Sequence, residues 1–359
     1  MTSAAVCVVV PVYNARATLA RCVDSILSQR VEGGLCCVLA EDGSTDGKTP
    51  ALCDGYAARD ARVRVVHLPN GGPSRARNAG MALAEAPYLV FLDADDALLP
   101  GALQAALTAQ AAAPDAFVLW RYTTDPAVPA AANGAAPDPA AARLPAAALA
   151  RLHLDCLLAM PWNKLYRTAL ARTLAFDPRY TLGEDLEFVL DYRAVLDKES
   201  PAAPYALVEA PLTYYDCTRE GGTLSTRYLP DAFSVWAAHF ARLNAAADAA
   251  AVPEADRRAL YRAELTVLAE SLAALLRQDP APLGIRHDKA AAALRDPRLR
   301  ELLGAFRRMA LYSPYYLPLL WRNQRLLYTV AELKRQGSPL FGKLDWLGFY
   351  LLLGRRRRT

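Results

Sequence analysis

Three carboxylates stand within four residues in the run Asp93-Ala94-Asp95-Asp96, directly after the apolar segment 88–92. Such groups repel one another unless a cation neutralises them, and oxygen-only ligands suit Mg²⁺ or Mn²⁺ that also binds substrate phosphates. The alternative is an acidic cap for a helix that begins near Pro100. Because the cluster follows a segment typical of a buried strand, we expect a divalent-metal site rather than a cap.

A second acidic pair, Glu184 and Asp185, follows Gly183 and precedes a segment with helical spacing of apolar residues. Such a pair can simply satisfy the dipole at a helix start. It can also supply a general base, Asp185, beside a carboxylate that binds acceptor hydroxyls. Trp162 and Lys164 add an aromatic ring and a cation to the same middle section; sugars often pack on aromatic faces, although a buried Trp is more often part of the core.

Two further clusters have side chains that suit a nucleotide. The turn 41–47 contains Asp42, which could accept a hydrogen bond from a nucleobase imide, while its other polar residues could cap the turn. Tyr13 and Asn14 place an aromatic ring and an amide at the end of the first apolar run. The alternative for Asn14 is an ordinary helix cap.

The Gly-rich run 70–80 leads into a predicted helix, and the amino end of a helix favours an anion. Arg75 and Arg77 both lie in the first turns of that helix, where their charge opposes the dipole. A simple surface charge pair is therefore a poor explanation for them. We expect these arginines to meet a diphosphate or a base.

The elements that must position these clusters alternate between strands and helices. Apolar, β-branched runs predict strands, and segments with helical apolar spacing separate them. This rhythm predicts an α/β fold with a mostly parallel sheet, whose ligand crevice lies at the carboxyl ends of the strands. The polar clusters should therefore meet at one edge of the sheet. The predicted strands are 6–12, 35–39, 63–67 and 88–92, and the predicted helices are 17–28, 49–59 and 73–85.

The composition of the 359 residues excludes a collagen, a coiled coil and a disordered chain, since 53% are hydrophobic and 22% charged. Seven scattered cysteines show no C-x-x-C pair and no zinc spacing, so we expect a reduced, cytosolic compartment. We expect no signal peptide. The apolar stretches 309–321 and 346–354 fall short of the roughly 18–20 residues that a spanning helix needs.

Charge is distributed unevenly along the chain. Residues 298–359 contain thirteen Lys or Arg and three Asp or Glu, a net charge of +10, so the rest of the chain is acidic. Arginines mixed with Trp, Tyr and Leu in residues 306–359 favour docking on an anionic membrane surface. The alternatives are a solvated basic tail or a contact with a second copy of the chain. No fold signature supports nucleic-acid binding.

Six motifs carry a resemblance to a known family. In this order and spacing, they resemble the family 2 glycosyltransferases with the GT-A fold, over roughly residues 4–228. The resemblance implies transfer of a sugar from a nucleoside-diphosphate donor, foremost a UDP-sugar, to an acceptor hydroxyl, with inversion and with Mn²⁺ or Mg²⁺. The motifs are VVVPVYN, EDGSTDG, NGGPSRARNAG, FLDADD, WNKLYR and LGEDLEF.

The resemblance also implies roles for individual residues. Glu41 departs from the more usual Asp, a mild change that leaves Asp42 in place, and the loop 219–225 resembles the family's segment over the diphosphate. Other positions resemble acceptor or diphosphate contacts. The implied nucleotide contacts are Pro11, Tyr13, Asn14, Asp42 (the base), Arg77 and Asp93 (the ribose); the metal ligand is Asp95, the catalytic base Asp185, and the acceptor or diphosphate contacts are Trp162, Lys164, Glu184 and Arg219.

These patterns together predict a catalytic domain over residues 1–228 with an Ala/Pro-rich surface loop at 125–147, a helical region over 229–305 and a basic aromatic tail over 306–359. We expect an inverting, metal-dependent glycosyltransferase on the cytosolic face of the cell membrane. Its acceptor would be a saccharide or a lipid-linked molecule used for a surface polysaccharide or glycolipid.

A non-catalytic sugar-nucleotide-binding scaffold is the main alternative, and the intact Asp93, Asp95 and Asp185 argue against it. A sugar-nucleotide pyrophosphorylase would carry a Gly-rich basic loop after its first strand. This chain has Pro11-Val12-Tyr13-Asn14 at that place instead.

Overall fold

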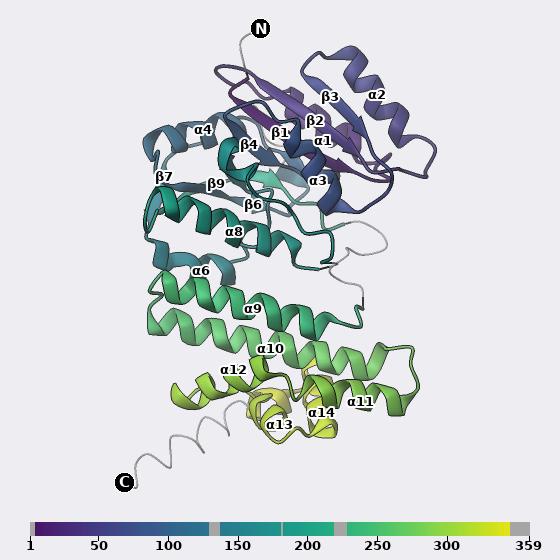
Figure 1. Cartoon of the computed structure of the whole chain (residues 1–359), viewed down its shortest axis with the longest axis vertical. Helices are drawn as coiled ribbons and strands as arrows, with labels where there is room; N and C mark the ends of the chain where they lie inside the picture. The colour runs from purple at the N-terminus through teal and green to yellow at the C-terminus, as the bar shows by residue number, and fades with distance from the viewer. Residues whose placement is uncertain (1–3, 129–136, 181, 219–227, 345–359) are drawn as a thin grey trace. The chain divides into compact units, whose positions relative to one another are not determined.

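The computed structural model describes residues 4–128, 137–180, 182–218 and 228–344 (Figure 1). The chain divides into two compact units, residues 1–223 and 224–359, and each is described by itself.

Unit 1 contains, within its described residues, a nine-stranded sheet with the order β3-β2-β1-β4-β8-β6-β9-β5, and β7 pairs with β9 outside this path. The pairs β3–β2, β2–β1, β1–β4 and β6–β9 are parallel, and the pairs β4–β8, β6–β8, β5–β9 and β7–β9 are antiparallel. The predicted parallel arrangement is confirmed for β1 to β4, and the sheet as a whole is mixed. The strands are β1 (Val6–Val12), β2 (Leu35–Glu41), β3 (Val63–His67), β4 (Tyr88–Phe91), β5 (Ala97–Leu98), β6 (Phe117–Thr123), β7 (Ala141–Leu144), β8 (Lys164–Arg167) and β9 (Tyr205–Tyr214).

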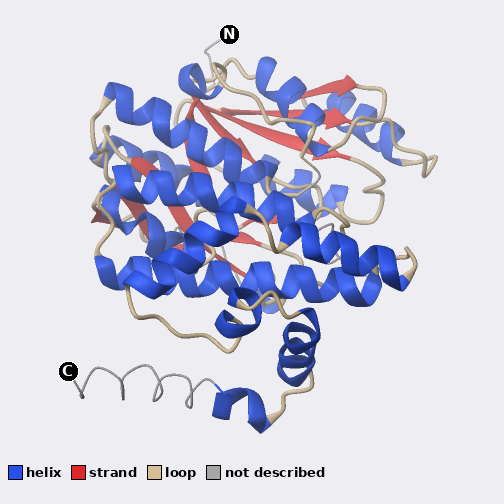
Figure 2. Cartoon of the chain, turned by 60° about the horizontal axis from the view of Figure 1, so that its bottom comes forward, coloured by secondary structure: helices blue, strands red, loops and turns tan. Residues whose placement is uncertain are grey.

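Helices flank this sheet on both faces (Figure 2). The predicted surface loop 125–147 contains a strand, because β7 finds backbone partners along the edge of β9; residues 129–136 of that loop lie outside the described residues. The helices of unit 1 are α1 (Leu19–Leu27), α2 (Thr49–Arg59), α3 (Pro73–Ala82), α4 (Ala102–Ala112), the 3₁₀ turn η1 (Ala146–Ala148), α6 (Leu149–Leu154), α7 (Thr168–Ala171) and α8 (Glu184–Glu199).

Strand β1 is buried on both faces, as its continuous β-branched run predicts. Val6, Val8, Val10 and Val12 belong to a core that also contains side chains of α1 and α4. On the opposite face, α3 approaches so closely that a Cβ added at Gly80 would lie 2.4 Å from Cγ1 of Val9. A glycine at this point therefore lets the helix that follows the Gly-rich loop lie directly on β1.

An aromatic cluster fastens α8 to the sheet. Phe91 at the end of β4 lies edge-on to Tyr166, Phe176 and Phe188, with ring centroids 5.2–5.7 Å apart. Phe176 and Phe188 stack on each other at 3.9 Å. Because Phe91 precedes Asp93 by two residues and Phe188 follows Asp185 by three, this packing sets the start of α8 against the end of β4.

Unit 2 is helical in its described residues, and α10 contacts α9, α11, α12 and α14. Phe306, Tyr315, Leu319 and Leu327 are buried, so much of the predicted tail belongs to a packed helical unit. No described helix combines the length and the apolar composition needed to cross a membrane. The helices are α9 (Ala232–Ala249), α10 (Glu254–Gln278), α11 (Leu283–Ala293), α12 (Pro297–Arg308), α13 (Tyr316–Leu320) and α14 (Gln324–Arg335), followed by helical residues 339–344.

Candidate active site

One buried guanidinium gathers the carboxylates that the sequence singles out. Arg77 of α3 is only 4% exposed. Its Nη2 donates to Oδ1 of Asp93 at 2.9 Å, and its Nη1 donates to Oδ1 of Asp185 at 2.7 Å and to Oε1 of Glu184 at 3.4 Å. The guanidinium also lies over the ring of Phe176, 5.3 Å from its centroid. Residues from α3, the end of β4 and the start of α8 therefore form one ionic cluster.

This arrangement changes the role expected for Arg77. The resemblance implies a nucleotide contact, but the guanidinium is buried and already faces three carboxylates. A cation in this position holds Asp93 and Asp185 at a fixed separation, and it compensates charges that would otherwise repel one another. We therefore assign Arg77 a positioning role.

The carboxyl group of Asp185 has the electrostatic properties of a general base. Burial raises its pKa to about 7; Arg77 opposes that shift, while Glu184 and Asp93 add to it. The side chain still keeps 29% of its surface exposed, so an acceptor hydroxyl can approach it. A carboxylate with a pKa near neutrality accepts a proton more effectively than an ordinary Asp.

The three aspartates after β4 differ in their surroundings. Asp96 is fully buried; its Oδ1 accepts from the backbone N–H of Asp216 at 3.0 Å, and its Oδ2 has no hydrogen-bond partner among the described residues. Burial, together with the nearby Asp93, raises the pKa of Asp96 to about 9. Asp93 and Asp95 are partly exposed. Asp96 therefore belongs to the core, whereas Asp93 and Asp95 reach solvent.

The remaining two carboxylates fit a hard divalent cation, although they do not complete its coordination. Among the residues that the structure describes, no three His, Cys, Asp or Glu side chains are grouped closely enough to hold a metal ion by themselves. A pair of oxygen ligands is typical of sites in which waters and substrate phosphates supply the rest of the shell.

The structure contains a contact that supports Asp95 and that the sequence patterns did not predict. Arg21 of α1 donates from Nη2 both to the backbone carbonyl of Asp95 and to the carboxylate of Asp216. Asp216 in turn accepts from the N–H and the hydroxyl of Thr218. Arg21 lies 195 residues from Asp216, so only the fold could bring them together.

The loops of the expected nucleotide site are tied together by side chains. Asn14 Oδ1 accepts from the N–H groups of Thr45 at 2.8 Å and Asp46 at 3.2 Å, and the N–H of Asn14 donates to Ser44 Oγ. These bonds join the loop after β1 to the loop after β2. Tyr13 beside them is 46% exposed.

Asp42 makes a similar connection to the Gly-rich loop. Its carboxylate is buried and accepts from the N–H groups of Gly71 at 2.9 Å and Gly72 at 2.8 Å. Gly43 has a positive φ of 64°, and a Cβ there would lie 2.7 Å from the backbone nitrogen of Asn70. The turn after β2 thus fits against the Gly-rich loop only with a glycine at position 43.

Two expected acceptor or diphosphate contacts are buried. The ring of Trp162 is 2% exposed, and Lys164 is fully buried. The Lys164 ammonium donates to the carbonyls of Leu157 and Met160 and to Oδ1 of Asn163, and burial lowers its pKa well below the usual range. Both side chains therefore lie beneath the site. Arg219 lies outside the described residues, and Pro11 is partly exposed at the end of β1.

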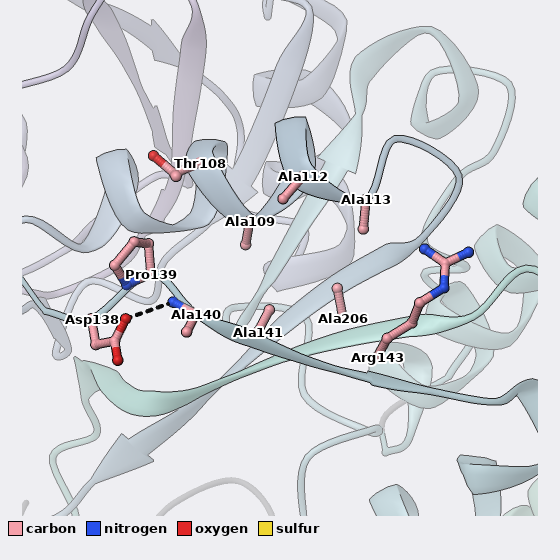
Figure 3. A pocket seen from close by; sticks show the side chains of 10 residues that line it. All are labelled: Thr108, Ala109, Ala112, Ala113, Asp138, Pro139, Ala140, Ala141, Arg143 and Ala206. Atoms are coloured by element: carbon pink, nitrogen blue, oxygen red, sulfur yellow. Dashed lines mark hydrogen bonds between the residues drawn. The ribbon is translucent and has the colours of Figure 1, made fainter.

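The hollow of about 360 Å³ shown in Figure 3 lies elsewhere in unit 1. Six of the ten residues that line it are alanines, which belong to α4, to β7, to the residues that directly flank these two elements and to the start of β9. Asp216 and the carboxylate cluster lie past the opposite end of β9. A second hollow of about 610 Å³ lies beside the loops that Asn14 joins and is lined partly by Arg16, Gly47 and Lys48.

Comparisons with known proteins agree with the motifs. Residues 7–167 match the family model described as glycosyl transferase family 2. The chain is 41% identical over 91 residues to the uncharacterized glycosyltransferase EpsJ of Bacillus subtilis, which is 25% of this chain and 26% of the relative. It is 38% identical over 102 residues to the chondroitin synthase of Pasteurella multocida, 28% of this chain and 10% of the relative. The chain thus matches about a quarter or less of the length of these curated relatives.

Solved structures agree in fold. Staphylococcus aureus TarS 1–349 in complex with UDP-GlcNAc has a TM-score of 0.62 at 20% identity, covering 93% of this chain and 92% of that one. The mannosyltransferase PcManGT from Pyrobaculum calidifontis, in complex with GDP-Man and Mn²⁺, has a TM-score of 0.50 at 18% identity, covering 92% and 86%. The expected GT-A-like fold, followed by a helical region, is confirmed.

Removing the central guanidinium should cost stability. Arg77→Met leaves three carboxylates without their shared cation, and breaking a buried ion pair on one side costs about 3–5 kcal/mol. Urea unfolding of the full chain measures the change. Arg75→Ala is the matched control, because Arg75 lies on the same helix but is exposed. An equal, small effect of both substitutions would show that the cluster does not hold α3, β4 and α8 together.

Proposed function

We propose that this chain, whose residues 7–167 belong to glycosyl transferase family 2, transfers a sugar from a nucleoside-diphosphate sugar to an acceptor hydroxyl. The observation that carries the proposal is the pairing of Asp93 and Asp185 with one buried guanidinium. In this proposal, Asp93 would bind the donor and Asp185 would take the proton, and their shared bonds to Arg77 support a common site. A scaffold that only bound the nucleotide would have no use for the raised pKa of Asp185.

The loops after β1, β2 and β3 would hold the nucleotide. The structures that resemble this chain were solved with UDP-GlcNAc, UDP and GDP-Man, which supports a nucleoside-diphosphate sugar, foremost a UDP-sugar. Tyr13 offers an exposed ring for the base. Pro11, Asn14 and Asp42 would form the rest of the site for the base, and Asp93 would bind the ribose.

Asp95, with Asp93 beside it, would hold Mn²⁺ or Mg²⁺. A divalent cation at this place, when bound, offsets the charge that develops on the departing diphosphate. Arg21 keeps the backbone of Asp95 in place from α1. The support for this step is the oxygen-only pair of ligands at the strand end.

Asp185 would accept the proton of the acceptor hydroxyl as its oxygen attacks the anomeric carbon. Arg77 keeps the carboxylate directed toward the donor side, and Glu184 beside it can accept a hydrogen bond from the acceptor. Attack from the face opposite the diphosphate inverts the configuration. The relatives named chondroitin synthase and hyaluronan synthase support a role in polysaccharide synthesis, and we extend this to cell-surface polysaccharide or glycolipid.

Unit 2 supplies the surface that we propose for an anionic membrane on the cytoplasmic side. Leu320 and Trp321 at the end of α13 are 46% and 62% exposed, and the exposed Arg322 and Arg325 follow them. We call these four residues the α13–α14 corner. An exposed Trp beside arginines suits the interface between lipid headgroups and acyl chains. Residues 345–359, with four further arginines, lie outside the described residues.

Donor hydrolysis tests the proposed function directly. The purified chain is screened with UDP-, GDP-, CMP- and TDP-sugars, with Mn²⁺, with Mg²⁺ and with excess EDTA. We expect hydrolysis of one donor class only when metal is present, and its loss in Asp95→Asn. Asp138→Asn is the control, since this exposed carboxylate lies beside the hollow of Figure 3. Full activity in EDTA would exclude the metal, and no activity with any donor would exclude the enzyme.

The base is tested by substitution and by pH. Asp185→Asn should lower transfer by about 10²–10⁴-fold, the usual contribution of a general base, while the Kd of the donor stays nearly the same. Because the unprotonated carboxylate is the active form, kcat/KM should rise with pH through a midpoint near 7. Asp191→Asn on the same helix is the control, and it should change neither the rate of transfer nor its dependence on pH. If donor binding collapsed while transfer per bound donor stayed normal, Asp185 would be a helix cap.

Membrane docking is tested by co-sedimentation with liposomes of varied anionic content. Substituting Arg322→Gln and Arg325→Gln should weaken binding to anionic vesicles, since each basic residue near such a surface contributes about 1 kcal/mol. Trp321→Ser should reduce the part of the binding that resists high salt, and deletion of residues 346–359 should add to either loss. Arg59→Gln with Arg64→Gln removes the same charge from unit 1 as a control. Equal binding to neutral and anionic vesicles, or no binding to either, would refute the electrostatic contribution to membrane docking.

A further inference from the structure

Two tyrosines stand side by side at the carboxyl ends of neighbouring strands. Tyr122 is the penultimate residue of β6, and Tyr215 directly follows β9. These strands are parallel, and the N–H of Tyr215 donates to the carbonyl of Thr123 at 2.8 Å. The two rings lie 6.0 Å apart with an interplanar angle of 89°.

The buried indole of Trp162 fixes both rings from behind. It stacks on Tyr215 at 5.2 Å with an angle of 23°, and it meets Tyr122 edge-on at 5.0 Å. Trp162 is almost fully buried, whereas both tyrosines are half-buried. A core cluster would bury all three rings alike. Here a buried ring supports two partly exposed ones, which we call the tyrosine wall (Tyr122 and Tyr215).

The tyrosine wall adjoins both halves of the candidate active site. On one side, β5 pairs with the end of β9, and the residue after Tyr215 donates its N–H to Asp96. Tyr215 is therefore a close neighbour of the aspartate cluster, and these carboxylates help burial to raise its pKa to about 12. On the other side, Trp162 lies two residues before the start of β8, which pairs with both β4 and β6. Tyr166 of β8 packs edge-on against Phe188, which follows Asp185 by three residues on α8.

The chemistry of the tyrosine wall suits a sugar ring. The C–H face of a pyranose is apolar and packs on an aromatic face, while its hydroxyls need polar partners at the rim. Both tyrosines keep neutral hydroxyls at physiological pH, as any phenol with a pKa of about 10 does, and these hydroxyls can donate to or accept from the sugar. An open-chain polyol phosphate lacks the flat C–H face that stacks on an aromatic ring, so the wall favours a pyranose over such an acceptor.

We propose that Tyr122 and Tyr215, supported by Trp162, form the acceptor platform, on which a pyranose ring stacks with one hydroxyl directed toward Asp185. The acceptor is then a saccharide rather than a polyol phosphate or a lipid headgroup. This inference rests on the proposed function, since it assigns the second substrate of the same reaction.

The test measures acceptor binding without requiring turnover. The full chain, loaded with UDP and diamagnetic Mg²⁺, is titrated with methyl β-D-glucopyranoside, methyl N-acetyl-β-D-glucosaminide or ribitol 5-phosphate. Saturation-transfer NMR records which ligand protons lie against aromatic rings. We expect transfer to the C–H protons of a pyranoside and none to ribitol 5-phosphate.

Paired substitutions separate the aromatic face from the bulk of the side chain. Tyr215→Leu and Tyr122→Leu remove the ring but keep an apolar side chain, and each should weaken pyranoside binding by about threefold to tenfold. Tyr215→Phe and Tyr122→Phe keep the aromatic ring, and each should weaken pyranoside binding less than the corresponding Leu substitution. Thermal unfolding of each variant shows that the fold is retained.

Three outcomes would overturn the proposal: transfer to ribitol 5-phosphate as strong as to the pyranosides, no pyranoside binding to the wild-type chain, or Leu variants that bind as the wild type does. The donor screen gives a separate answer. If donor is hydrolysed but no pyranoside binds, the acceptor platform is wrong and the glycosyltransferase stands. If no donor is hydrolysed, the proposed function itself fails.

Discussion

The buried guanidinium of Arg77 is the constraint on which the site depends. An isolated charge in this position would be too costly to bury, so the fold must bring carboxylates to it. The carboxylates come from the end of β4 and the start of α8. The aromatic packing of Phe91 on Phe188 holds these two elements together. Burial of the cluster, Glu184 and Asp93 raise the pKa of Asp185, and Arg77 lowers it. One cluster therefore couples the stability of the fold to the chemistry of the site.

Side-chain bonds to backbone amides give the remaining loops their shape. Asn14 binds the loop after β2, and Asp42 binds the loop after β3. Loops at strand ends have few ladder bonds of their own, so such crosslinks replace the regular hydrogen bonds that hold the strands. The nucleotide pocket that we propose for these loops would be largely ordered before its ligand arrives, which lowers the free-energy cost of binding.

The carboxyl ends of β6 and β9 complete the same edge of the sheet with a different chemistry. Aspartates follow β4, whereas tyrosines end β6 and follow β9, with Trp162 packed behind them. A charged half and an aromatic half thus lie side by side. This division suits the proposed reaction, in which a sugar leaves a charged diphosphate and bonds to a hydroxyl of a neutral sugar ring.

Local patterns in the sequence were sufficient for strands β1 to β4, for helices α1 to α3 and for the edge of the sheet on which the polar clusters meet. Apolar periodicity reports which face is buried, and parallel strands bring their carboxyl ends together, so β1 to β4 and the positions of Asp42, Asp93 and Asp185 follow from short windows. The sequence could not show which of these side chains reach solvent. That depends on partners far along the chain: Arg77 meets a carboxylate 108 residues away, and Arg21 meets one 195 residues away. Lys164 looked like a ligand contact and is buried, because backbone carbonyls of the preceding segment surround its ammonium. The tyrosine wall was not predicted, because its two rings lie 93 residues apart in the chain and meet only when β6 pairs with β9. Tertiary packing decided these points because burial and pairing are properties of the assembled sheet, which no short window of residues contains.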